Sequence, residues 1–248
     1  MTKPRILIVG ESCRDVFVYC DASRMAPDLP IPVLHVIYQT ENPGMAKNVE
    51  RNVKTIYPAC DLVTNDNWRD ITKTRFVHDK TNHAFVRVDA GASVGHVDVR
   101  SLPLADYDII AISDYDKGFL DENDMRYICG HHDCVFVDTK KPVGEFLNDC
   151  LFIKINEKEY RRSLPVPESL TQRIIMTKAE RGAEFQGVTY PVEASEVKDA
   201  TGAGDSFFAA LLVSYAETGD ICDAIRFANQ CASYAVQHRG VTVIVRPR

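Results

Sequence analysis

The chain has 248 residues, of which 45% are hydrophobic and 26% are charged, a balance typical of a globular protein and not of a disordered one. Its 29 basic and 35 acidic residues give a formal net charge of −6, which disfavours binding to the phosphate backbone of a nucleic acid. No apolar run approaches the roughly 20 residues that a transmembrane helix needs, so we expect a cytoplasmic protein without a membrane contact.

Short apolar runs predict the strands of a parallel sheet. Each run is nearly continuous over about five residues, which is typical of strands that are buried on both faces. The runs are Arg5–Val9, Asp108–Ile112, Cys134–Asp138, Leu151–Ile155 and Arg173–Thr177. Helix-length intervals separate them, so the sequence predicts an α/β fold with a mostly parallel central sheet flanked by helices.

Other segments predict a small accessory sheet. Residues Pro32–Ile37, and the pair Thr74–His78 and Ala84–Val88, alternate between apolar and polar side chains, as half-exposed antiparallel strands do. The polar stretch Asp79–His83 lies between the last two and predicts a hairpin loop. We therefore expect lid strands beside the main sheet, within about 12–48 and 71–90.

Two helices are predicted in the last third of the chain. From Asp205, and again from Asp220, apolar side chains recur at helical spacing, and Gly219 between them suits a helix end. The first of these helices follows directly on residues Asp199–Asp205, which read Asp-Ala-Thr-Gly-Ala-Gly-Asp and are called the glycine string below.

The glycine string suits the transfer of a phosphate. Small residues at Gly202, Ala203 and Gly204 let the backbone turn tightly onto a helix start. The backbone amides and the positive end of the helix dipole at such a start favour an anion. A carboxylate at Asp205 can accept the proton of an attacking hydroxyl. Without a phosphate, the same residues would only turn the chain and cap the helix.

The glycine string closely resembles the C-terminal signature of ribokinase-like carbohydrate kinases, the phosphofructokinase-B family. The resemblance implies a three-layer ribokinase-like fold with a small β-sheet lid, and an enzyme that transfers the γ-phosphoryl group of ATP to a sugar hydroxyl with Mg²⁺. It implies that Asp205 is the catalytic base and that Gly202, Ala203 and Gly204 form an anion hole. It extends over essentially the whole chain, so residues 1–248 are interpreted as a single kinase domain.

Further motifs follow in the family's order on the nucleotide side. Residues 156–159 resemble the family's N-x-x-E motif, which implies that Asn156 and Glu159 organise phosphate and, through water, Mg²⁺. A helix start that is rich in acidic residues gives the same pattern without a metal. The resemblance alone implies a monovalent cation such as K⁺ near Asp199.

The resemblance also assigns residues to the nucleotide pocket. Residues 177–182 are similar to the family's strand-end segment near the nucleotide, with Thr177 and Gly182 at the matching positions. Asn229 matches a position beside the adenine pocket, and a polar residue on a helix surface is the alternative interpretation. Gly204 of the anion hole belongs to the nucleotide site as well.

The N-terminal half is similar to heptose-7-phosphate kinases, which phosphorylate the anomeric hydroxyl of that sugar. Residues Ser23–Val33 resemble their S-R-x-x-P-E-x-P-V-P-V segment, and Ile112–Gly118 resembles their S-D-Y-x-K-G. A phosphorylated sugar needs cations, and arginines on paired strands can provide a fork for its phosphate, although each single cation could equally be a solvated surface charge. The resemblance implies the following substrate-binding residues: Asp15, Gly44, Asn48, Lys73, Arg75, Arg87 and Lys117.

The sequence departs from the family at two places. In the stretch Pro43–Asn48, Met45 replaces a glycine that lets the backbone approach the sugar, and Lys47 adds a charge, which puts the sugar's identity in question. The stretch Tyr57–Asp70 is short, so some elements at the sheet edge are expected to be missing. We also expect no following nucleotidyltransferase domain, which some bifunctional heptose enzymes carry.

Three functions therefore stay open at this stage. The first is an ATP-dependent kinase for heptose 7-phosphate, giving heptose 1,7-bisphosphate. The second is a kinase for another sugar, sugar phosphate or nucleoside, because of Met45 and Lys47. The third is a non-catalytic nucleotide- or sugar-binding protein on the same fold, which the shortened middle of the chain would favour. A half-apolar lid sheet also favours a homodimer through the lid strands.

Overall fold

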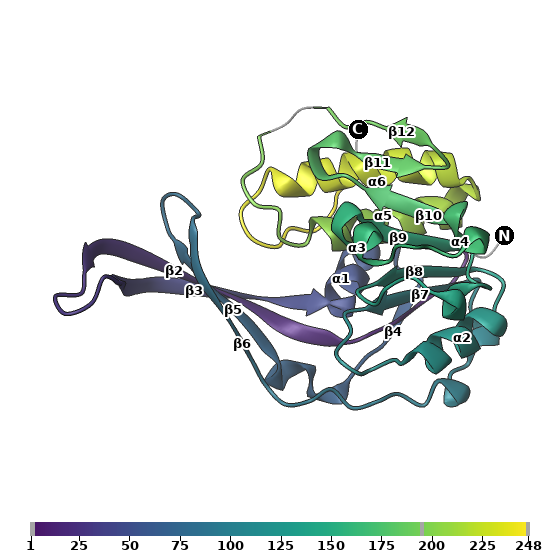
Figure 1. The fold of residues 1–248 in the computed structure, drawn as a ribbon, viewed down its shortest axis with the longest axis horizontal. Coiled ribbons are helices and arrows are strands. Elements are labelled where there is room, and N and C mark those ends of the chain that lie inside the picture. The colour runs from purple at the N-terminus through teal and green to yellow at the C-terminus, as the bar shows by residue number, and fades with distance from the viewer. Residues whose placement is uncertain (1–2, 194–195, 247–248) are drawn as a thin grey trace.

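The computed structural model describes residues 3–193 and 196–246, and these residues build two sheets (Figure 1). Within this part of the chain the larger sheet has eight strands, in the order β12-β11-β10-β9-β8-β7-β1-β4. Its strands are β1 (Ile6–Val9), β4 (Cys60–Val63), β7 (Ile109–Asp114), β8 (Val135–Thr139), β9 (Phe152–Asn156), β10 (Ile174–Thr177), β11 (Ala183–Phe185) and β12 (Val188–Tyr190). The six neighbouring strands β10, β9, β8, β7, β1 and β4 are parallel to one another. Strand β11 is antiparallel to β10, and β12 is antiparallel to β11.

Helices cover both faces of the larger sheet. They are α1 (Ala46–Ile56), α2 (Glu122–Gly130), α3 (Glu157–Arg162), α4 (Glu168–Thr171), α5 (Ala203–Thr218) and α6 (Ile221–Val236), with 3₁₀ turns η1 (Asp66–Asp70), η2 (Val99–Ser101), η3 (Leu104–Asp106), η4 (Glu145–Leu147) and η5 (Ala179–Arg181). In the residues that the structure describes, none of these helices is both long and apolar enough to cross a membrane.

The apolar runs are continuous because both faces of each central strand are buried. Ile6 and Ile8 of β1 pack into the same cluster as the buried residues of α1, α5 and α6. Leu7 and Val9 alternate with them and pack on the opposite face, in the cluster that contains Met125 of α2. This arrangement of helices, sheet and helices confirms the predicted three-layer α/β fold.

The smaller sheet is the predicted lid, with the strand order β3-β2-β5-β6. Its strands are β2 (Ser12–Met25), β3 (Pro32–Met45), β5 (Thr72–His78) and β6 (Ala84–Ala90). The hairpin of β2 and β3 extends beyond the other two strands and projects away from the larger sheet (Figure 1). Both strands of this hairpin lie within residues 12–48, and the last three residues of that range, Ala46–Asn48, begin α1.

The segment between β4 and β5 is short, as the sequence predicts. Over the described residues 64–71 the chain forms only η1 before it enters the lid. Asn65 fixes this segment by accepting a hydrogen bond from the amide of Ser12, at 2.8 Å, at the start of β2. Strand β4 is therefore an edge of the larger sheet.

Candidate active site

The glycine string forms the start of α5. Gly202 is the N-cap of this helix, and its φ of 80° lies in the left-handed region, which glycine adopts without a steric penalty. A Cβ atom on Gly202 would lie 3.2 Å from Asn48 Nδ2, so the backbone approaches that side chain closely. Asp205 lies in the first helical turn and is buried, with 7% of its surface exposed. The Ala203 amide donates to the Ala200 carbonyl at 3.2 Å.

Each carboxylate oxygen of Asp205 accepts a hydrogen bond. Asn48 Nδ2 donates to Oδ2 at 2.8 Å, and the phenol hydroxyl of Tyr115 donates to Oδ1. Burial raises the pKa of the Asp205 carboxyl above its ordinary value, although the hydrogen bonds from Asn48 and Tyr115 oppose this shift. A carboxyl with a raised pKa that lies at a helix N-terminus is suited to accept a proton.

Helix α1 holds Asn48 in place. Asn52, one turn further along α1, donates from its side-chain amide to the carbonyl oxygen of Asn48 at 2.8 Å and to Asn48 Oδ1 at 3.2 Å. The Oδ1 atom of Asn52 in turn accepts from the amide of Ile244 at 2.9 Å. Both asparagines are buried, so this chain of hydrogen bonds fixes the side chain that contacts the carboxylate of Asp205.

A buried ion pair lies beside the start of α5. Lys154 Nζ of β9 lies 2.8 Å from Asp138 Oδ2 of β8, and each side chain is only 4% exposed. A Cβ atom on Gly204 would lie 3.1 Å from Lys154 Nζ, so this ammonium adjoins the helix start. The sequence analysis assigned no role to either residue, although a lysine within the apolar strand Phe152–Asn156 was a visible signal.

Asn156 and Glu159 form a capping box at the start of α3. The Glu159 amide donates to Asn156 Oδ1, and Glu159 Oε2 accepts from the Asn156 amide, both at 2.9 Å. The motif therefore caps a helix, as the alternative interpretation of the N-x-x-E pattern predicts. Glu159 Oε1 also lies 2.5 Å from Lys140 Nζ, the ammonium that follows β8.

The carboxylates around Lys140 form a site that suits Mg²⁺ and the phosphates of a nucleotide. Burial lowers the pKa of the Lys140 ammonium, but the carboxylates of Asp138, Glu159 and Asp205 outweigh it and hold this pKa above its ordinary value. Asp138 Oδ1 is buried and has no hydrogen-bond partner among the described residues. Carboxylate and amide oxygens are the ligands that Mg²⁺ takes in proteins, so this donor set suits Mg²⁺ together with the phosphates of a nucleotide.

The lid contributes Asp15 and Arg75. Arg75 Nη1 of β5 lies 2.7 Å from Asp15 Oδ1 of β2. A Cβ atom on Gly44 would overlap the Asp15 carboxylate, so the backbone of β3 approaches this group closely. Asp15 lies within a long strand and not at a strand end, because the chain continues from β1 into the lid.

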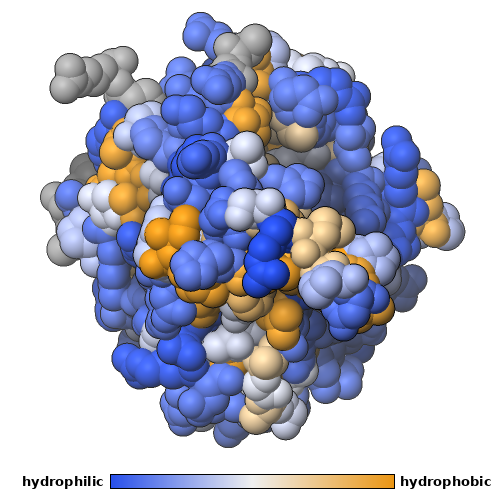
Figure 2. Space-filling model, turned by 90° about the vertical axis from the view of Figure 1, so that its left-hand side faces the viewer, coloured by the Kyte–Doolittle hydropathy of each residue, from blue (hydrophilic) through white to orange (hydrophobic). Residues whose placement is uncertain are grey.

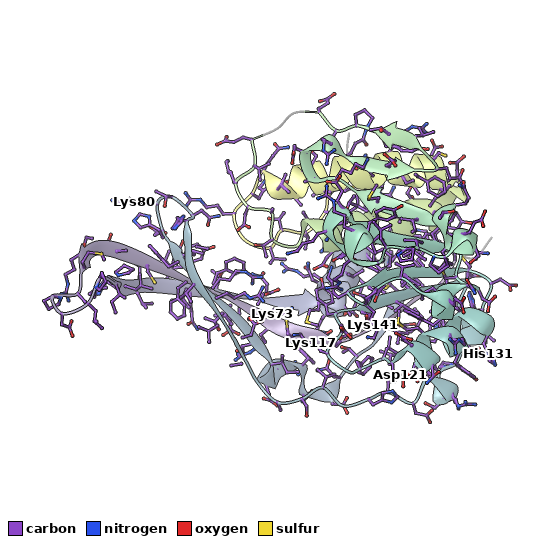
Figure 3. The ribbon with its side chains drawn as sticks, in the orientation of Figure 1. Lys73, Lys80, Lys117, Asp121, His131 and Lys141 are labelled. Carbon is purple, nitrogen blue, oxygen red and sulfur yellow. The ribbon has the colours of Figure 1, made fainter. Side chains whose placement is uncertain are left out.

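The other positively charged side chains of the lid differ in their surroundings: Arg87 is half exposed, and Lys73 lies against an aromatic ring. Arg87 lies directly opposite Arg75 in the β5–β6 pairing, so both side chains leave the same face, but Arg87 is half exposed and pairs with Asp89 at 2.8 Å. Lys73 Nζ lies 4.7 Å from the ring centroid of Tyr115. Figure 3 shows Lys73 and Lys117 where the lid meets the larger sheet, and the Lys117 amide donates to Glu11 Oε1 at 2.7 Å.

Cys13 lies on the same lid face as Asp15, and its thiol lies beside Gly44 of β3. Burial raises the pKa of this thiol to about 12. Lys73 pairs with Asp15 in the β2–β5 register, and its ammonium lies at the ring of Tyr115, whose hydroxyl bonds to Asp205. The lid face that carries Asp15 and Lys73 therefore lies near the start of α5.

Two further residues of the predicted nucleotide site lie in β10 and α6. Thr177 ends β10, and Asn229 of α6 is buried and donates to the carbonyl of Tyr190 at 2.8 Å. Asn229 is thus not an exposed helix residue. A groove of about 600 Å³ adjoins it, lined by β12, residues 191–193 and α6, with Glu193 and Gln237 among its side chains.

Gly182 closes the turn after β10, and its substitution is expected to destabilise the fold. Its φ is 83°, and a Cβ atom there would overlap the carbonyl oxygen of Tyr190. Gly182→Ala is expected to lower the free energy of unfolding by about 2–3 kcal/mol in urea titrations. Gly187→Ala is the matched control, because Gly187 has a φ of 75° but nothing within 4 Å of a Cβ, and about 1 kcal/mol is expected. Equal losses would contradict the overlap.

Asp199 joins the glycine string to the lid. Its carboxylate accepts from the amides of Thr201, at 2.9 Å, and Gly240, at 3.0 Å. Asn82 at the tip of the β5–β6 hairpin donates to the Lys198 carbonyl at 3.0 Å, and Arg239 donates to two carbonyls of the same hairpin. These hydrogen bonds hold the tip of the β5–β6 hairpin beside the glycine string.

Met45 and Lys47, the two residues at the start of α1 that differ from the family pattern, have different environments. Met45 is buried and keeps a φ of 62°, the left-handed conformation that favours glycine. The ammonium of Lys47 lies 3.4 Å from Glu50 and 5.2 Å from the ring centroid of Trp68 in η1. The added charge is thus paired on the surface of α1.

Comparisons with known proteins identify a family and several relatives. A family model described as pfkB family carbohydrate kinase matches residues 100–247, more than half of the chain. The bifunctional protein HldE of Helicobacter pylori (strain G27) is 27% identical, over 95% of this chain and 63% of the relative. HldE of Nitrobacter winogradskyi is 28% identical, over 96% of this chain and 61% of the relative. The chain therefore spans less than two thirds of the length of these relatives.

Solved structures share the fold. Ribokinase from Thermotoga maritima matches with a TM-score of 0.74 at 17% identity, over 96% of this chain and 94% of that one. Phosphofructokinase-2 from Escherichia coli, in complex with potassium, matches with a TM-score of 0.73 at 14% identity, over 98% and 96%. These similarities confirm the predicted ribokinase-like architecture.

Proposed function

The chain belongs to the pfkB family of carbohydrate kinases, and we propose that it transfers the γ-phosphoryl group of ATP to a hydroxyl of heptose 7-phosphate. Asp205 at the start of α5 is the observation on which this proposal mainly rests. It is a buried carboxyl with a raised pKa, and it accepts hydrogen bonds from Asn48 of α1 and from Tyr115 after β7. Residues 1–248 act as a single kinase domain in this proposal.

In the proposed reaction the acceptor hydroxyl attacks the γ-phosphorus in line. The proton of the hydroxyl passes to Asp205, and the bond between the γ-phosphorus and the leaving oxygen of ADP breaks. The amides at the start of α5, with the ammonium of Lys154 beside Gly204, stabilise the charge on the phosphoryl group. Closure under the lid excludes water from the acceptor.

Mg²⁺ is part of the proposal. Asn156 and Glu159 would hold it, largely through water, together with the ATP phosphates, and Asp138 adds an unpaired carboxylate oxygen nearby. The ion would neutralise phosphate charge as it develops. A monovalent cation near Asp199 stays a prediction.

The lid supports a phosphorylated sugar as the acceptor. Arg75 and Arg87 leave the lid face that carries Asp15, and Lys73 lies on this face at the Tyr115 ring. Guanidinium groups on neighbouring strands suit a phosphate, which they can bind with paired hydrogen bonds. In this proposal Asp15, Gly44 and Asn48 contact the sugar, and the cations, with Lys117, bind its phosphate.

Arg75→Gln tests the phosphate site. We expect this variant to lower the preference for heptose 7-phosphate over unphosphorylated heptose by about tenfold, because charge-assisted hydrogen bonds to the phosphate are lost. The measurement is kcat/KM for both sugars at saturating ATP. Arg14→Gln is the matched control, because Arg14 lies on β2 next to Asp15 but points to the opposite lid face, where it pairs with Glu41 at 3.1 Å. An unchanged preference in Arg75→Gln would mean that the acceptor carries no phosphate there.

A homodimer through the lid strands is also proposed. Large apolar side chains of the lid and its hairpin are exposed: Met25, Leu29, Ile31, Val36, Ile37, Tyr38, Val86 and Val88. Figure 2, which views the molecule from the side of the lid, shows hydrophobic side chains among hydrophilic ones on this surface. Exposed strands with apolar side chains favour pairing with another chain. Sedimentation of a monomer at all concentrations would contradict the dimer.

A further inference from the structure

Tyr115 holds the carboxylate oxygen of Asp205 that Asn48 does not contact. Its hydroxyl donates to Oδ1, while Asn48 donates to Oδ2. A general base needs one oxygen within hydrogen-bond reach of the proton that it removes. Each oxygen can accept a further hydrogen bond, but Asp205 is buried, so replacing one of these two donors is the direct way for an acceptor hydroxyl to reach the carboxylate.

The two donors differ in how firmly they are held. Asn48 is buried in α1 and bonded twice to Asn52. Tyr115 begins the segment 115–118 that follows β7, and the three residues after it are exposed. The backbone of this segment is held through Lys117, whose amide donates to Glu11, and through Asp116, which pairs with Lys141 at 3.1 Å. Among the described residues the hydroxyl of Tyr115 is hydrogen-bonded to Asp205 alone, so Tyr115 is the donor that an incoming hydroxyl would replace.

The Tyr115 ring also lies beside two ammonium groups. Lys73 Nζ of the lid is 4.7 Å from its centroid, and Lys140 Nζ, after β8, is 5.3 Å from it. A cation is attracted to the face of an aromatic ring at such distances. Movement of the ring would remove this contact from both ammonium groups, while Lys140 stays 2.5 Å from Glu159 Oε1.

We propose that Tyr115 protects the catalytic base from water. Its hydroxyl occupies Asp205 Oδ1 when no sugar is bound, and the acceptor hydroxyl of the sugar displaces the Tyr115 hydroxyl from this oxygen. This inference rests on the proposed function, because it takes Asp205 as the base. It adds to that function a means by which ATP is protected when no sugar is bound. Tyr115 is in this sense a positioning residue, which acts through Asp205.

The reaction that Tyr115 prevents is the hydrolysis of ATP. A water oxygen would bond to the γ-phosphorus, the bond from phosphorus to the leaving oxygen would break, and its electron pair would leave with ADP. The proton of the water would pass to Asp205, as the proton of the sugar hydroxyl does in transfer. Removal of the Tyr115 hydroxyl leaves space for about one water molecule against Oδ1.

The test is the variant Tyr115→Phe, assayed with Mg²⁺-ATP with and without heptose 7-phosphate. We expect ATP hydrolysis without sugar to rise about tenfold, and the KM for the sugar to fall several-fold because no hydrogen bond has to be displaced. We expect kcat for transfer to change by less than about threefold, since the contact is absent once the sugar is bound. The double variant Tyr115→Phe/Asp205→Asn is expected to lose the added hydrolysis.

Tyr107→Phe is the matched control. Tyr107, at the other end of β7, donates from its hydroxyl to Asp61 Oδ2 at 3.0 Å, and its change should leave hydrolysis and the sugar KM as they are. A hundredfold loss of kcat in Tyr115→Phe without added hydrolysis would overturn the proposal and make the tyrosine a participant in transfer. Unchanged hydrolysis and KM would overturn it as well. Transfer that survives Asp205→Asn would instead overturn the proposed function.

Discussion

Asp205→Asn is expected to lower kcat for phosphoryl transfer by about 10²- to 10⁴-fold, the range that removal of a general base produces. The amide keeps the shape of the carboxyl and can still take part in hydrogen bonds with Asn48 and Tyr115, so the loss should fall on proton transfer and not on folding. The measurement is kcat under saturating ATP and sugar. Activity within tenfold of that of the parent enzyme would contradict the role of Asp205, and ATP binding without turnover in the parent enzyme would favour a non-catalytic binding protein.

Asp223→Asn is the matched control for this substitution. Asp223 occupies the same position in the first turn of α6 that Asp205 occupies in α5, but it is exposed, and within the described part of the chain it pairs with Arg226 and Asp220 of the same helix and its cap. Its amide variant should keep the parent kcat. A comparable loss in both variants would point to a general effect of helix charge and not to a base.

The pH dependence of Asp205→Asn follows from the same burial. Because burial raises the pKa of Asp205 in the folded state, the carboxyl increasingly opposes folding as the pH rises from the ordinary aspartate pKa to the raised one. The amide has no such dependence, so its free energy of unfolding should gain on that of the parent between the ordinary aspartate pKa and the raised one. The acid limb of kcat/KM in the parent should likewise lie above the ordinary aspartate pKa.

Lys154→Met is expected to destabilise the protein by about 3–5 kcal/mol, because it leaves the carboxylate of Asp138 buried without a partner. Chemical denaturation at neutral pH measures this loss. Lys54→Met is the matched control, since Lys54 is half exposed on α1 and its ion pair with Glu50, at 2.7 Å, is expected to contribute less than about 1 kcal/mol.

The double variant Lys154→Met/Asp138→Leu separates stability from catalysis. An apolar pair can replace a buried ion pair with little loss, so most of the stability should return. Transfer should stay about 10²-fold slower, because no ammonium then adjoins Gly204 at the start of α5 and because the carboxylate of Asp138 near the proposed Mg²⁺ site is lost as well. Recovery of both stability and activity would mean that Lys154 is structural only.

The larger sheet and the start of α5 could be predicted from the sequence because their signals are local. Continuous apolar runs such as Leu151–Ile155 report burial on both faces, and the glycines of the glycine string report a turn onto a helix. The first half of β2 was harder to interpret. Its run Val16–Cys20 does not alternate, because Phe17 and Tyr19 pack toward Val241 while Val16, Val18 and Cys20 pack on the other lid face.

The contacts at the carboxylate of Asp205 could not be predicted in the same way. Tyr115 and Lys140 follow different strands, and nothing in their local sequence states that both lie near Asp205. Lys154 interrupts an apolar strand, but its partner Asp138 is 16 positions away on a neighbouring strand. Such pairs depend on the register of the sheet, which short patterns leave open.

The hydrogen bond between Asn48 and Asp205 joins positions 157 residues apart, and the bond from Ile244 to Asn52 that supports it joins positions 192 apart. Such long loops are expected to close late in folding. The chain loses conformational entropy when the loop closes, and the contacts that offset this loss form only afterwards. Refolding from denaturant should therefore restore secondary structure earlier than it restores turnover. The return of catalysis is thus a measure of the last stage of assembly, when the two ends of the sequence have met.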